Sequence, residues 1–375
     1  MAEVTGTCDD RFEAVRETLE ANLDSGADLG ASVAVVLDGE PVVDLWGGWT
    51  DEARTRPWQR DTITNVWSTT KTMTFVCCLI LAERGELDLD APVATYWPEF
   101  AAEGKDRIAV RHLLSHTSGL SGWDVPMRPE DLADWDGATA ALAAQAPWWE
   151  PGSASGYHAV TQGYLLGEVI RRVTGASIGA FFAEEVARPL GADFHIGLPE
   201  SEDHRVAPLV PPPPVDLGAV QASDIAVRTL ANPPLDVTQT YDAWWRRAEI
   251  PAANGQGNAR SVALVQSVVA GGGEARGVRL FSEGTCERIF EEQSAGTDLV
   301  LGVPIRFGMG YGLRTDFMPI GPRACYWGGY GGSVIVMDLD VRLTVAYVMN
   351  RMESGLVGDP RGMNLVLAAA GSLAR

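Results

Sequence analysis

The chain has 375 residues, of which 46% are hydrophobic and 21% are charged, and this length allows one large domain or two lobes around a substantial core. The formal net charge of −21 argues against binding to nucleic acid or to an anionic membrane surface, because both would repel the protein. The same charge keeps an ordinary globular protein soluble.

The N-terminal third predicts a helix, a β-hairpin and a second helix. Apolar residues at helical spacing favour an amphipathic helix over 10–23. Two β-rich runs, 31–37 and 41–46, flank a short turn and predict a hairpin. The apolar segment 69–84 predicts a buried helix that ends at Gly85.

Further helices and a proline-rich connection follow in the middle of the chain. The periodicity predicts a short helix at 111–115 and two longer helices at 163–174 and 178–187. From 208 to 234 the chain is rich in proline, which predicts a long surface connection without regular structure.

Strand signals return near the C-terminus, after a predicted helix at 259–269. The β-prone runs are 311–313, 325–327, 334–338 and 343–349. A terminal helix is predicted at 365–373. Strands at both ends with helices between them favour an α/β (α+β) fold with one antiparallel sheet flanked by helices, built from residues 1–66 and 257–375. A mainly helical domain, residues 67–256, is then inserted into this discontinuous sheet domain.

Ser68 and Lys71 are the first candidates for chemistry. Of the 29 basic residues, only Lys71 and Lys105 are lysines. Arginine stays protonated at working pH, whereas a buried lysine with a lowered pKa can serve as a base. Residues three apart share one face of a helix, so Lys71 is expected beside the Ser68 hydroxyl, near the unpaired N–H groups of the helix start. By itself, this pattern also fits an ordinary surface pair.

Two glycine-rich segments add to this pattern. One is Gly152-Ser153-Ala154-Ser155-Gly156-Tyr157, a flexible loop that carries a tyrosine, and the other is Trp327-Gly328-Gly329-Tyr330-Gly331-Gly332-Ser333. Glycines at such places let a ligand approach the backbone closely. Both segments are therefore candidates for the surroundings of Ser68.

With these segments, the chain resembles the serine β-lactamase-like superfamily, in particular its family VIII carboxylesterases. The matching motifs are Ser68-Thr69-Thr70-Lys71, Val110-Arg111-His112-Leu113-Leu114-Ser115-His116-Thr117-Ser118-Gly119-Leu120, Tyr157 and Trp327-Gly328-Gly329. They occur in the family's order, and the resemblance covers most of the chain. It implies the β-lactamase/transpeptidase-like fold of the class C enzymes, with the active site between the sheet and the helical domain.

The same resemblance implies a role for each matching residue. Ser68 would be the acylated nucleophile, with Lys71 and Tyr157 as general base and general acid. Which of these two takes the serine proton stays open. The backbone N–H groups of Ser68 and Tyr330 would form the oxyanion hole. The reaction requires no metal and no organic cofactor.

Two departures from the family pattern bear on the substrate. Ala159 stands where β-lactamases and penicillin-binding proteins usually carry an asparagine, and Trp327-Gly328-Gly329 replaces their Lys-Thr-Gly triplet. Tryptophan cannot pair with a substrate carboxylate but can line an apolar pocket, so we expect neutral, short-acyl esters as substrates and weak or absent β-lactam turnover. Trp327, Gly328, Gly329 and Trp123 are the expected substrate contacts.

Other functions remain open from the sequence. A β-lactamase, a D-aminopeptidase or a small-amide hydrolase would use the same catalytic residues, and a relative that only binds would keep the fold without turnover. The intact set of Ser68, Lys71 and Tyr157 favours an enzyme. We expect a small-molecule ester as the partner, and neither nucleic acid nor a membrane; the oligomeric state is not predicted.

Three other patterns have simpler explanations. Gly175-Ala176-Ser177-Ile178-Gly179 matches a nucleophile elbow, but a helix rather than a strand precedes it, which favours Ser177 as a helix N-cap. His112 and His116 have the spacing of zinc ligands, yet no third ligand is evident, which favours structural roles. The pairs Trp148-Trp149 and Trp244-Trp245 fit the helical core better than a pocket wall.

The start of the chain and its cysteines favour a cytoplasmic protein. Met1-Ala2-Glu3-Val4 has neither the basic nor the apolar region of a signal peptide. The longest apolar run, 74–82, is too short to cross a bilayer. The five cysteines are odd in number and contain no CxxC pair, which predicts free thiols rather than a disulfide framework.

Overall fold

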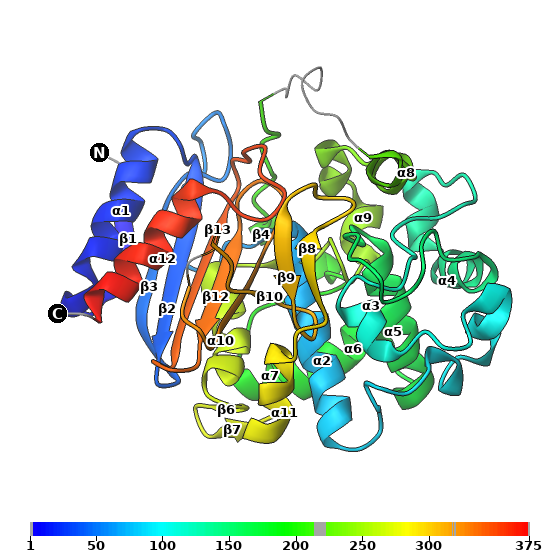
Figure 1. The fold of residues 1–375 in the computed structure, drawn as a ribbon. Coiled ribbons are helices and arrows are strands. Elements are labelled where there is room, and N and C mark those ends of the chain that lie inside the picture. The colour runs from blue at the N-terminus through cyan, green and yellow to red at the C-terminus, as the bar shows by residue number, and fades with distance from the viewer. Residues whose placement is uncertain (1–2, 214–222, 317, 319, 374–375) are drawn as a thin grey trace.

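The computed structural model describes residues 3–213, 223–316, 318 and 320–373. Its centre is an antiparallel sheet with the strand order β1-β3-β2-β13-β12-β11-β10-β9-β8. The strands are β1 (Val4–Cys8), β2 (Gly30–Leu37), β3 (Glu40–Gly48), β8 (Ser294–Thr297), β9 (Pro304–Phe307), β10 (Gly312–Leu313), β11 (Ala324–Gly328), β12 (Val334–Asp338) and β13 (Leu343–Met349). The two ends of the chain therefore build one sheet together, seen in blue and orange in Figure 1.

β2 and β13 join these two ends of the chain in the middle of the sheet. Ala34 pairs with Ala346 and Val35 pairs with Val345 in an antiparallel register. Both strands are buried along almost their whole length. They are mostly apolar because helices cover the sheet on both faces, so neither set of alternating side chains meets water.

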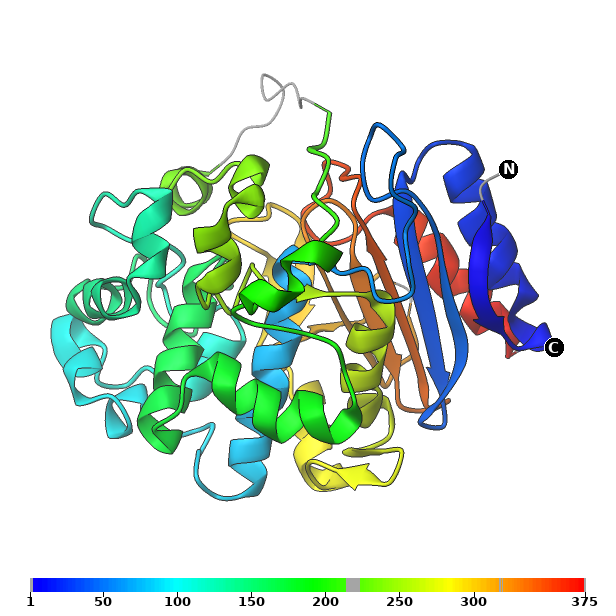
Figure 2. The same ribbon diagram turned by 180° about the vertical axis from the view of Figure 1, so that it is seen from behind.

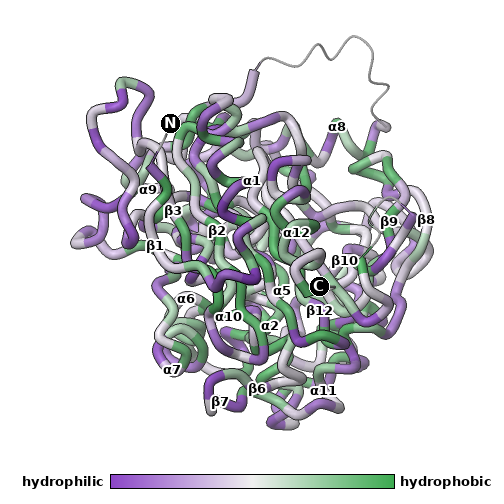
Figure 3. Tube along the Cα trace, turned by 90° about the vertical axis from the view of Figure 1, so that its left-hand side faces the viewer, coloured by the Kyte–Doolittle hydropathy of each residue, from purple (hydrophilic) through white to green (hydrophobic). Residues whose placement is uncertain are grey.

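The helices on the two faces come from both ends of the chain. α1 (Glu13–Asp24) and α12 (Pro360–Ser372) lie together on one face, and α10 (Ala259–Ala270) lies on the other. Figure 3 looks onto α1 and α12 and shows that α1 alternates between hydrophilic and hydrophobic residues. The predicted apolar face of the first helix is confirmed, since Val15 and Leu19 are fully buried.

The middle of the chain forms a helical region on the side of the sheet away from α1 and α12 (Figures 1 and 2). Its helices are α2 (Lys71–Glu83), α3 (Val110–Leu114), α4 (Trp135–Ala144), α5 (Thr161–Thr174), α6 (Ile178–Phe182), α7 (Arg188–Leu190), α8 (Asp224–Ala231) and α9 (Ala243–Arg247). α11 (Glu283–Glu287) and the ladder of β6 (Glu274–Ala275) with β7 (Val278–Arg279) follow later. An antiparallel sheet with an inserted helical region is the fold class that the sequence predicts.

The chain leaves and re-enters the sheet region at one place. β4 (Thr64–Asn65) pairs with β5 (Gln256–Gly257), so that Asn65 lies opposite Gln256. The domain boundaries expected after 66 and before 257 fall beside this two-stranded ladder. The boundaries themselves stay a prediction.

α2 is the central helix of the helical region and is buried over most of its length. A helix that is hydrophobic on all sides belongs in a protein core. Cys77 and Cys78 are free and buried within it, in agreement with the prediction of free thiols. Within the described residues, neither α2 nor any other helix has the length and apolar character needed to cross a membrane.

Several elements differ from the sequence-based expectations. α8 lies inside the stretch 208–234 that the sequence predicts as an irregular connection, and Ser223 caps this helix by accepting the Ala226 N–H. Residues 214–222 of that stretch lie outside the described residues. The predicted helix 178–187 begins as α6 and continues as a π-helical turn. The sequence also did not predict β1, β8, β9 and α4.

Candidate active site

Ser68 lies on a single 3-10 turn, η2 (Trp67–Thr70), that runs directly into α2. Trp67 has a φ of +46°. This left-handed backbone conformation costs a bulky residue about 1–3 kcal/mol and occurs mostly at functional sites. Ser68 therefore stands just before the α-helix, and Lys71 begins it three residues later, as the spacing predicts.

Lys71 is buried, and its amine has three partners. Nζ lies 3.1 Å from Ser68 Oγ, 2.7 Å from the carbonyl oxygen of Ala159 and 2.9 Å from that of Ala252. The two carbonyls can only accept hydrogen bonds, so they take up the two N–H groups of a neutral amine. Its lone pair then faces the proton of the Ser68 hydroxyl.

The surroundings of Lys71 favour this neutral form. Burial lowers the pKa of Lys71 well below its usual value of 10.5, because removal from water disfavours the ammonium ion. Among the described residues, no carboxylate forms an ion pair with Lys71 that would restore the charge. The amine can therefore act as a base near neutral pH.

Tyr157 reaches the same hydroxyl from a loop distant in the sequence. Its phenol O–H donates to Ser68 Oγ at 2.5 Å, and Lys71 Nζ lies 4.7 Å from the centre of its ring. Burial raises the pKa of Tyr157, so the phenol keeps its proton. The phenol donates to Ser68 Oγ, and when the amine is neutral the serine hydroxyl can donate to Lys71 Nζ across the 3.1 Å contact.

The turn after β11 lies against the turn that carries Ser68. A Cβ on Gly329 would lie 2.3 Å from the carbonyl oxygen of Val66, which explains why glycine is required there. Ser333 Oγ donates to the same carbonyl oxygen at 3.0 Å, and Thr69 Oγ1 lies 2.9 Å from Ser333 Oγ. Two hydroxyl groups therefore fasten the two turns together.

The expected oxyanion hole falls between these two turns. The backbone N–H groups of Ser68 and Tyr330 donate no hydrogen bond to any other described residue. Both residues line the same cavity. Unpaired N–H groups of this kind can bind the negative oxygen that develops during acyl transfer, and their role in this protein stays a prediction.

The cavity over Ser68 has a volume of about 220 Å³ and an apolar character. Trp123, one of the predicted substrate contacts, lines it, as do Leu235 and Val237. None of the described residues that line this cavity carries a charge. The sequence did not identify Leu230, Leu235 or Val237 as part of the site, although Ser223 offers an N-cap signal for the helix that contains Leu230 and precedes the other two.

Trp327 lies behind the site rather than in the cavity wall. Its ring is fully buried and packs against Tyr157, with the ring centres 5.5 Å apart, and it stacks on His116 at 5.9 Å. Neither Trp327 nor Gly328 or Gly329 is among the residues that line the cavity. The structure shows a ring that supports Tyr157, and the role of Trp327 as a substrate contact stays a prediction.

The other sequence candidates have structural roles. Ser177 caps α6 by accepting the Ala180 N–H. Nδ1 of His112 accepts a hydrogen bond from the Ala109 N–H. Nδ1 of His116 accepts one from the His158 N–H at 3.0 Å. Within the part of the chain that the structure describes, no group of three or more histidine, cysteine or acidic residues could hold a metal ion.

The tryptophan pairs also lie outside the cavity over Ser68. Trp245 is fully buried and donates from Nε1 to the side chain of Asn65. Trp148 stacks with the guanidinium of Arg228, whose carbon lies 3.9 Å from the ring centre. Neither pair lines the cavity, in agreement with their interpretation as packing residues.

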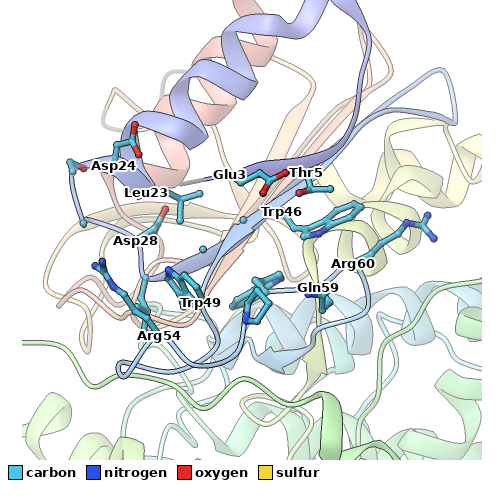
Figure 4. Close-up of a pocket in the computed structure, with 17 residues that line it drawn as sticks. Glu3, Thr5, Leu23, Asp24, Asp28, Trp46, Trp49, Arg54, Gln59 and Arg60 are labelled. Atoms are coloured by element: carbon cyan, nitrogen blue, oxygen red, sulfur yellow. The ribbon is translucent and has the colours of Figure 1, made fainter. Parts of the chain in front are cut away.

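A larger cavity, of about 890 Å³, lies at another place, beside the N-terminal strand and the loop after β3 (Figure 4). Leu23, Trp49 and Arg54 are among the residues that line it. Ser68 and Tyr157 are not. Size alone therefore does not mark the candidate active site, which is defined by its hydrogen-bonded side chains.

Comparison with known proteins shows the family of the chain. A family model described as Beta-lactamase matches residues 15–370. The chain belongs to the beta-lactamase family. Over 370 residues it is 37% identical to the esterase/beta-lactamase LipL of Mycobacterium tuberculosis. The aligned region covers 94% of this chain and 84% of LipL.

Solved structures of the family share the fold over nearly the whole chain. A family VIII carboxylesterase superposes with a TM-score of 0.94 at 44% identity and covers 99% of this chain and 100% of that structure. A penicillin-binding protein homolog from Caulobacter crescentus has a TM-score of 0.92 at 39% identity. The superposition covers 99% of this chain and 100% of that structure. Both the resemblance and the fold that the sequence predicts are thereby confirmed.

Proposed function

We propose that the protein is a serine carboxylesterase that hydrolyses neutral, short-acyl esters through an acyl-enzyme on Ser68. The observation that carries this proposal is the position of Lys71, whose buried amine is held by two carbonyl oxygens and lies 3.1 Å from Ser68 Oγ. The names of LipL and of the family VIII carboxylesterase support an ester hydrolase.

In the acylation step, Ser68 Oγ attacks the ester carbonyl carbon while Lys71 Nζ takes the serine proton. The new bond between Oγ and carbon pushes one electron pair onto the carbonyl oxygen, which the N–H groups of Ser68 and Tyr330 stabilise. When the intermediate collapses, the bond to the alcohol oxygen breaks. The leaving alcohol receives a proton from Tyr157, and the protonated Lys71 then returns a proton to Tyr157.

Water completes the cycle by attacking the acyl-enzyme. Lys71, again neutral, takes a proton from the attacking water as its oxygen bonds to the acyl carbon, while Tyr157 keeps its proton and donates a hydrogen bond to Ser68 Oγ. The second intermediate breaks the bond to Ser68 Oγ, which takes the proton back, and the carboxylic acid is released. Burial keeps both groups neutral between turnovers, as each role requires.

The cavity supports neutral and small substrates. It offers about 220 Å³ and no charged side chain among its described lining residues. A β-lactam or a peptide C-terminus carries a carboxylate, which would lose its hydration there without gaining a cation. A β-lactamase remains the second candidate, because the name of LipL includes that activity.

A burst experiment with p-nitrophenyl butyrate tests the proposal. We expect the wild-type protein to release nitrophenol rapidly in an amount equal to the enzyme, because the acyl-enzyme accumulates, and Ser68→Ala to show no burst. Ser177→Ala is the matched control, since Ser177 is the other motif serine and caps a helix. A normal burst in Ser68→Ala would refute the assigned nucleophile.

The same preparation distinguishes the two candidate activities. We expect turnover of a chromogenic cephalosporin to be at least about a hundredfold slower than that of p-nitrophenyl butyrate, because the uncharged cavity binds its carboxylate poorly. Equal rates on the two substrates would favour the β-lactamase instead.

A further inference from the structure

Asp298 is a buried carboxylate in the loop between β8 and β9, at one edge of the sheet. Its Oδ1 accepts hydrogen bonds from three backbone N–H groups, those of Tyr157 at 3.0 Å, Val300 at 2.9 Å and Leu301 at 2.9 Å. Two of these donors belong to the same loop, whereas Tyr157 is 141 residues away in the sequence. One oxygen atom therefore ties the loop to the backbone of Tyr157.

The rest of loop 298–303 holds the same segment. The Leu299 N–H donates to the carbonyl oxygen of Ser155 at 2.8 Å. Within the loop, the Asp298 N–H donates to Val303 O at 3.1 Å and the Gly302 N–H donates to Asp298 O at 2.9 Å. The support for Tyr157 is thus a loop that is closed by its own hydrogen bonds and contacts two residues of the tyrosine segment.

The side chain of Tyr157 is held by packing from the same hairpin. Val300 and Phe307 form a small apolar core with Tyr157 and Trp327. Dense packing restricts where the ring can lie, but it does not fix the position of the main chain by itself. The hydrogen bond from the Tyr157 N–H to Asp298 supplies that restraint.

A carboxylate at this place is costly for the fold. Asp298 is 1% exposed, and its Oδ2 has no hydrogen-bond partner among the described residues. An unpaired buried oxygen destabilises the folded state. Such a cost is found where a group serves function rather than stability.

We propose that Asp298 is a positioning residue for Tyr157 and that it holds the phenol oxygen within hydrogen-bond distance of Ser68 Oγ through the Tyr157 backbone. The inference rests on the proposed role of Tyr157 in proton transfer. The phenol–serine contact is 2.5 Å long, and a displacement of about 1 Å at a reacting centre can cost about a hundredfold in rate. Asp298 itself does not line the cavity.

Two substitutions separate the position of the carboxylate from its charge. Asp298→Asn keeps an acceptor oxygen at Oδ1 and removes the charge, whereas Asp298→Glu keeps the charge and moves the oxygen by one methylene group. With p-nitrophenyl butyrate, we expect Asp298→Asn to keep kcat within about threefold of the wild-type value. We expect Asp298→Glu to lose at least about tenfold in kcat, with KM changed by less than about threefold.

Asp44→Glu is the matched control, because it lengthens another buried carboxylate that lies on β3 and bonds to Arg260 outside the cavity. Its kcat is expected to stay unchanged when thermal unfolding shows that the protein is folded. Wild-type kcat in Asp298→Glu, or a loss in Asp298→Asn as large as in Asp298→Glu, would overturn the inference.

If Asp298→Glu does not fold, Asp298→Ser is measured in its place. Its shorter side chain cannot reach all three N–H groups, so it must show the same loss of kcat, and wild-type kcat would overturn the inference. Failure of the proposed function is seen separately, as the absence of a burst in the wild-type protein or a burst in Ser68→Ala. Failure of the positioning role leaves both of those results intact.

Discussion

The two lysines of this chain show how one residue type serves two purposes. Nζ of Lys71 and Nζ of Lys105 are both buried and both donate to backbone carbonyl oxygens. Lys71 has Ser68 as its third partner, whereas Lys105 lies near the ring of Phe100. The hydroxyl beside Lys71 is therefore the feature that makes it, and not Lys105, the candidate base.

Replacing Lys71 by arginine tests its role as the base. Arginine keeps the positive charge but does not give up its proton, so we expect Lys71→Arg to lose about 10²–10⁴-fold in kcat/KM. Lys105→Arg is the control and should retain near wild-type activity when folded. Steady-state kinetics on p-nitrophenyl butyrate provide the measurement, and comparable activity in the two variants would contradict the assignment.

The pH dependence of the rate reports the protonation of Lys71. Only the neutral amine accepts a proton, so activity rises with pH through the pKa of Lys71 in the free enzyme. Because burial lowers this pKa well below 10.5, we expect kcat/KM to reach a plateau well before that pH. A rate that keeps rising up to the pH of an ordinary lysine would show that the amine is not perturbed.

At the scale of elements, the site depends on two turns that are distant in the sequence. The glycine-rich turn after β11 reaches the Ser68 turn only because Gly329 has no side chain, and Ser333 bridges the gap with its hydroxyl. Sequence patterns show that such a turn is flexible, but they do not show which backbone it approaches.

Gly329→Ala tests this close approach. The new Cβ would lie 2.3 Å from Val66 O and 2.4 Å from Ser333 Oγ, so the turns must separate. We expect a loss of about 1–3 kcal/mol in the free energy of unfolding and at least about a tenfold slower acylation of Ser68 by a fluorophosphonate.

Gly371→Ala is the control for this substitution. A Cβ at Gly371, in α12, meets nothing within 4 Å, and alanine favours a helix over glycine by up to about 1 kcal/mol. We expect unchanged acylation and equal or higher stability in urea unfolding. Faster or unchanged acylation in Gly329→Ala would mean that the turns do not need to touch.

The strands that sequence analysis missed share a physical cause. β1 is a short edge strand whose central residue is Gly6, so it has neither the length nor the alternation that marks a strand. β8 and β9 are four residues each. Such strands form because a neighbouring strand offers its hydrogen-bonding groups, which is a property of the assembled sheet.

At the scale of the whole molecule, a buried charge network joins the sheet, α12 and the turn that carries Tyr330. Arg361 donates to Asp28 Oδ1 at 2.9 Å and to the carbonyl oxygen of Gly331 at 2.8 Å, and it also pairs with Asp359. Tyr347 donates to Asp28 Oδ1 at 2.6 Å. Burial of these groups places a titrating carboxyl inside the fold.

Asp28 should therefore make stability depend on pH. Burial raises its pKa from 3.8 to about 6, despite the opposing effect of Arg361. The stabilisation from protonated Asp28 is fully present below about pH 4 and is lost as the pH rises through about 6. Over that range the loss amounts to roughly 3 kcal/mol.

Asp28→Asn isolates this effect, because asparagine resembles the neutral acid and cannot titrate. We expect the free energy of unfolding of the wild-type protein, minus that of Asp28→Asn, to fall between pH 4 and pH 6 and to stay level above pH 7. Urea unfolding at a series of pH values measures it. A difference that does not change with pH would show that Asp28 is ionised throughout.

The sequence by itself determined the candidate pair and the family. Ser68 and Lys71 are three residues apart, so local chain geometry brings them together, and the ordered motifs predicted the fold class. Only the tertiary structure decided what surrounds them. Tyr157 and Ala252 contact this pair from 89 and 181 residues away, and the buried position that lowers the pKa of Lys71 exists only once the sheet and the helical region have packed together.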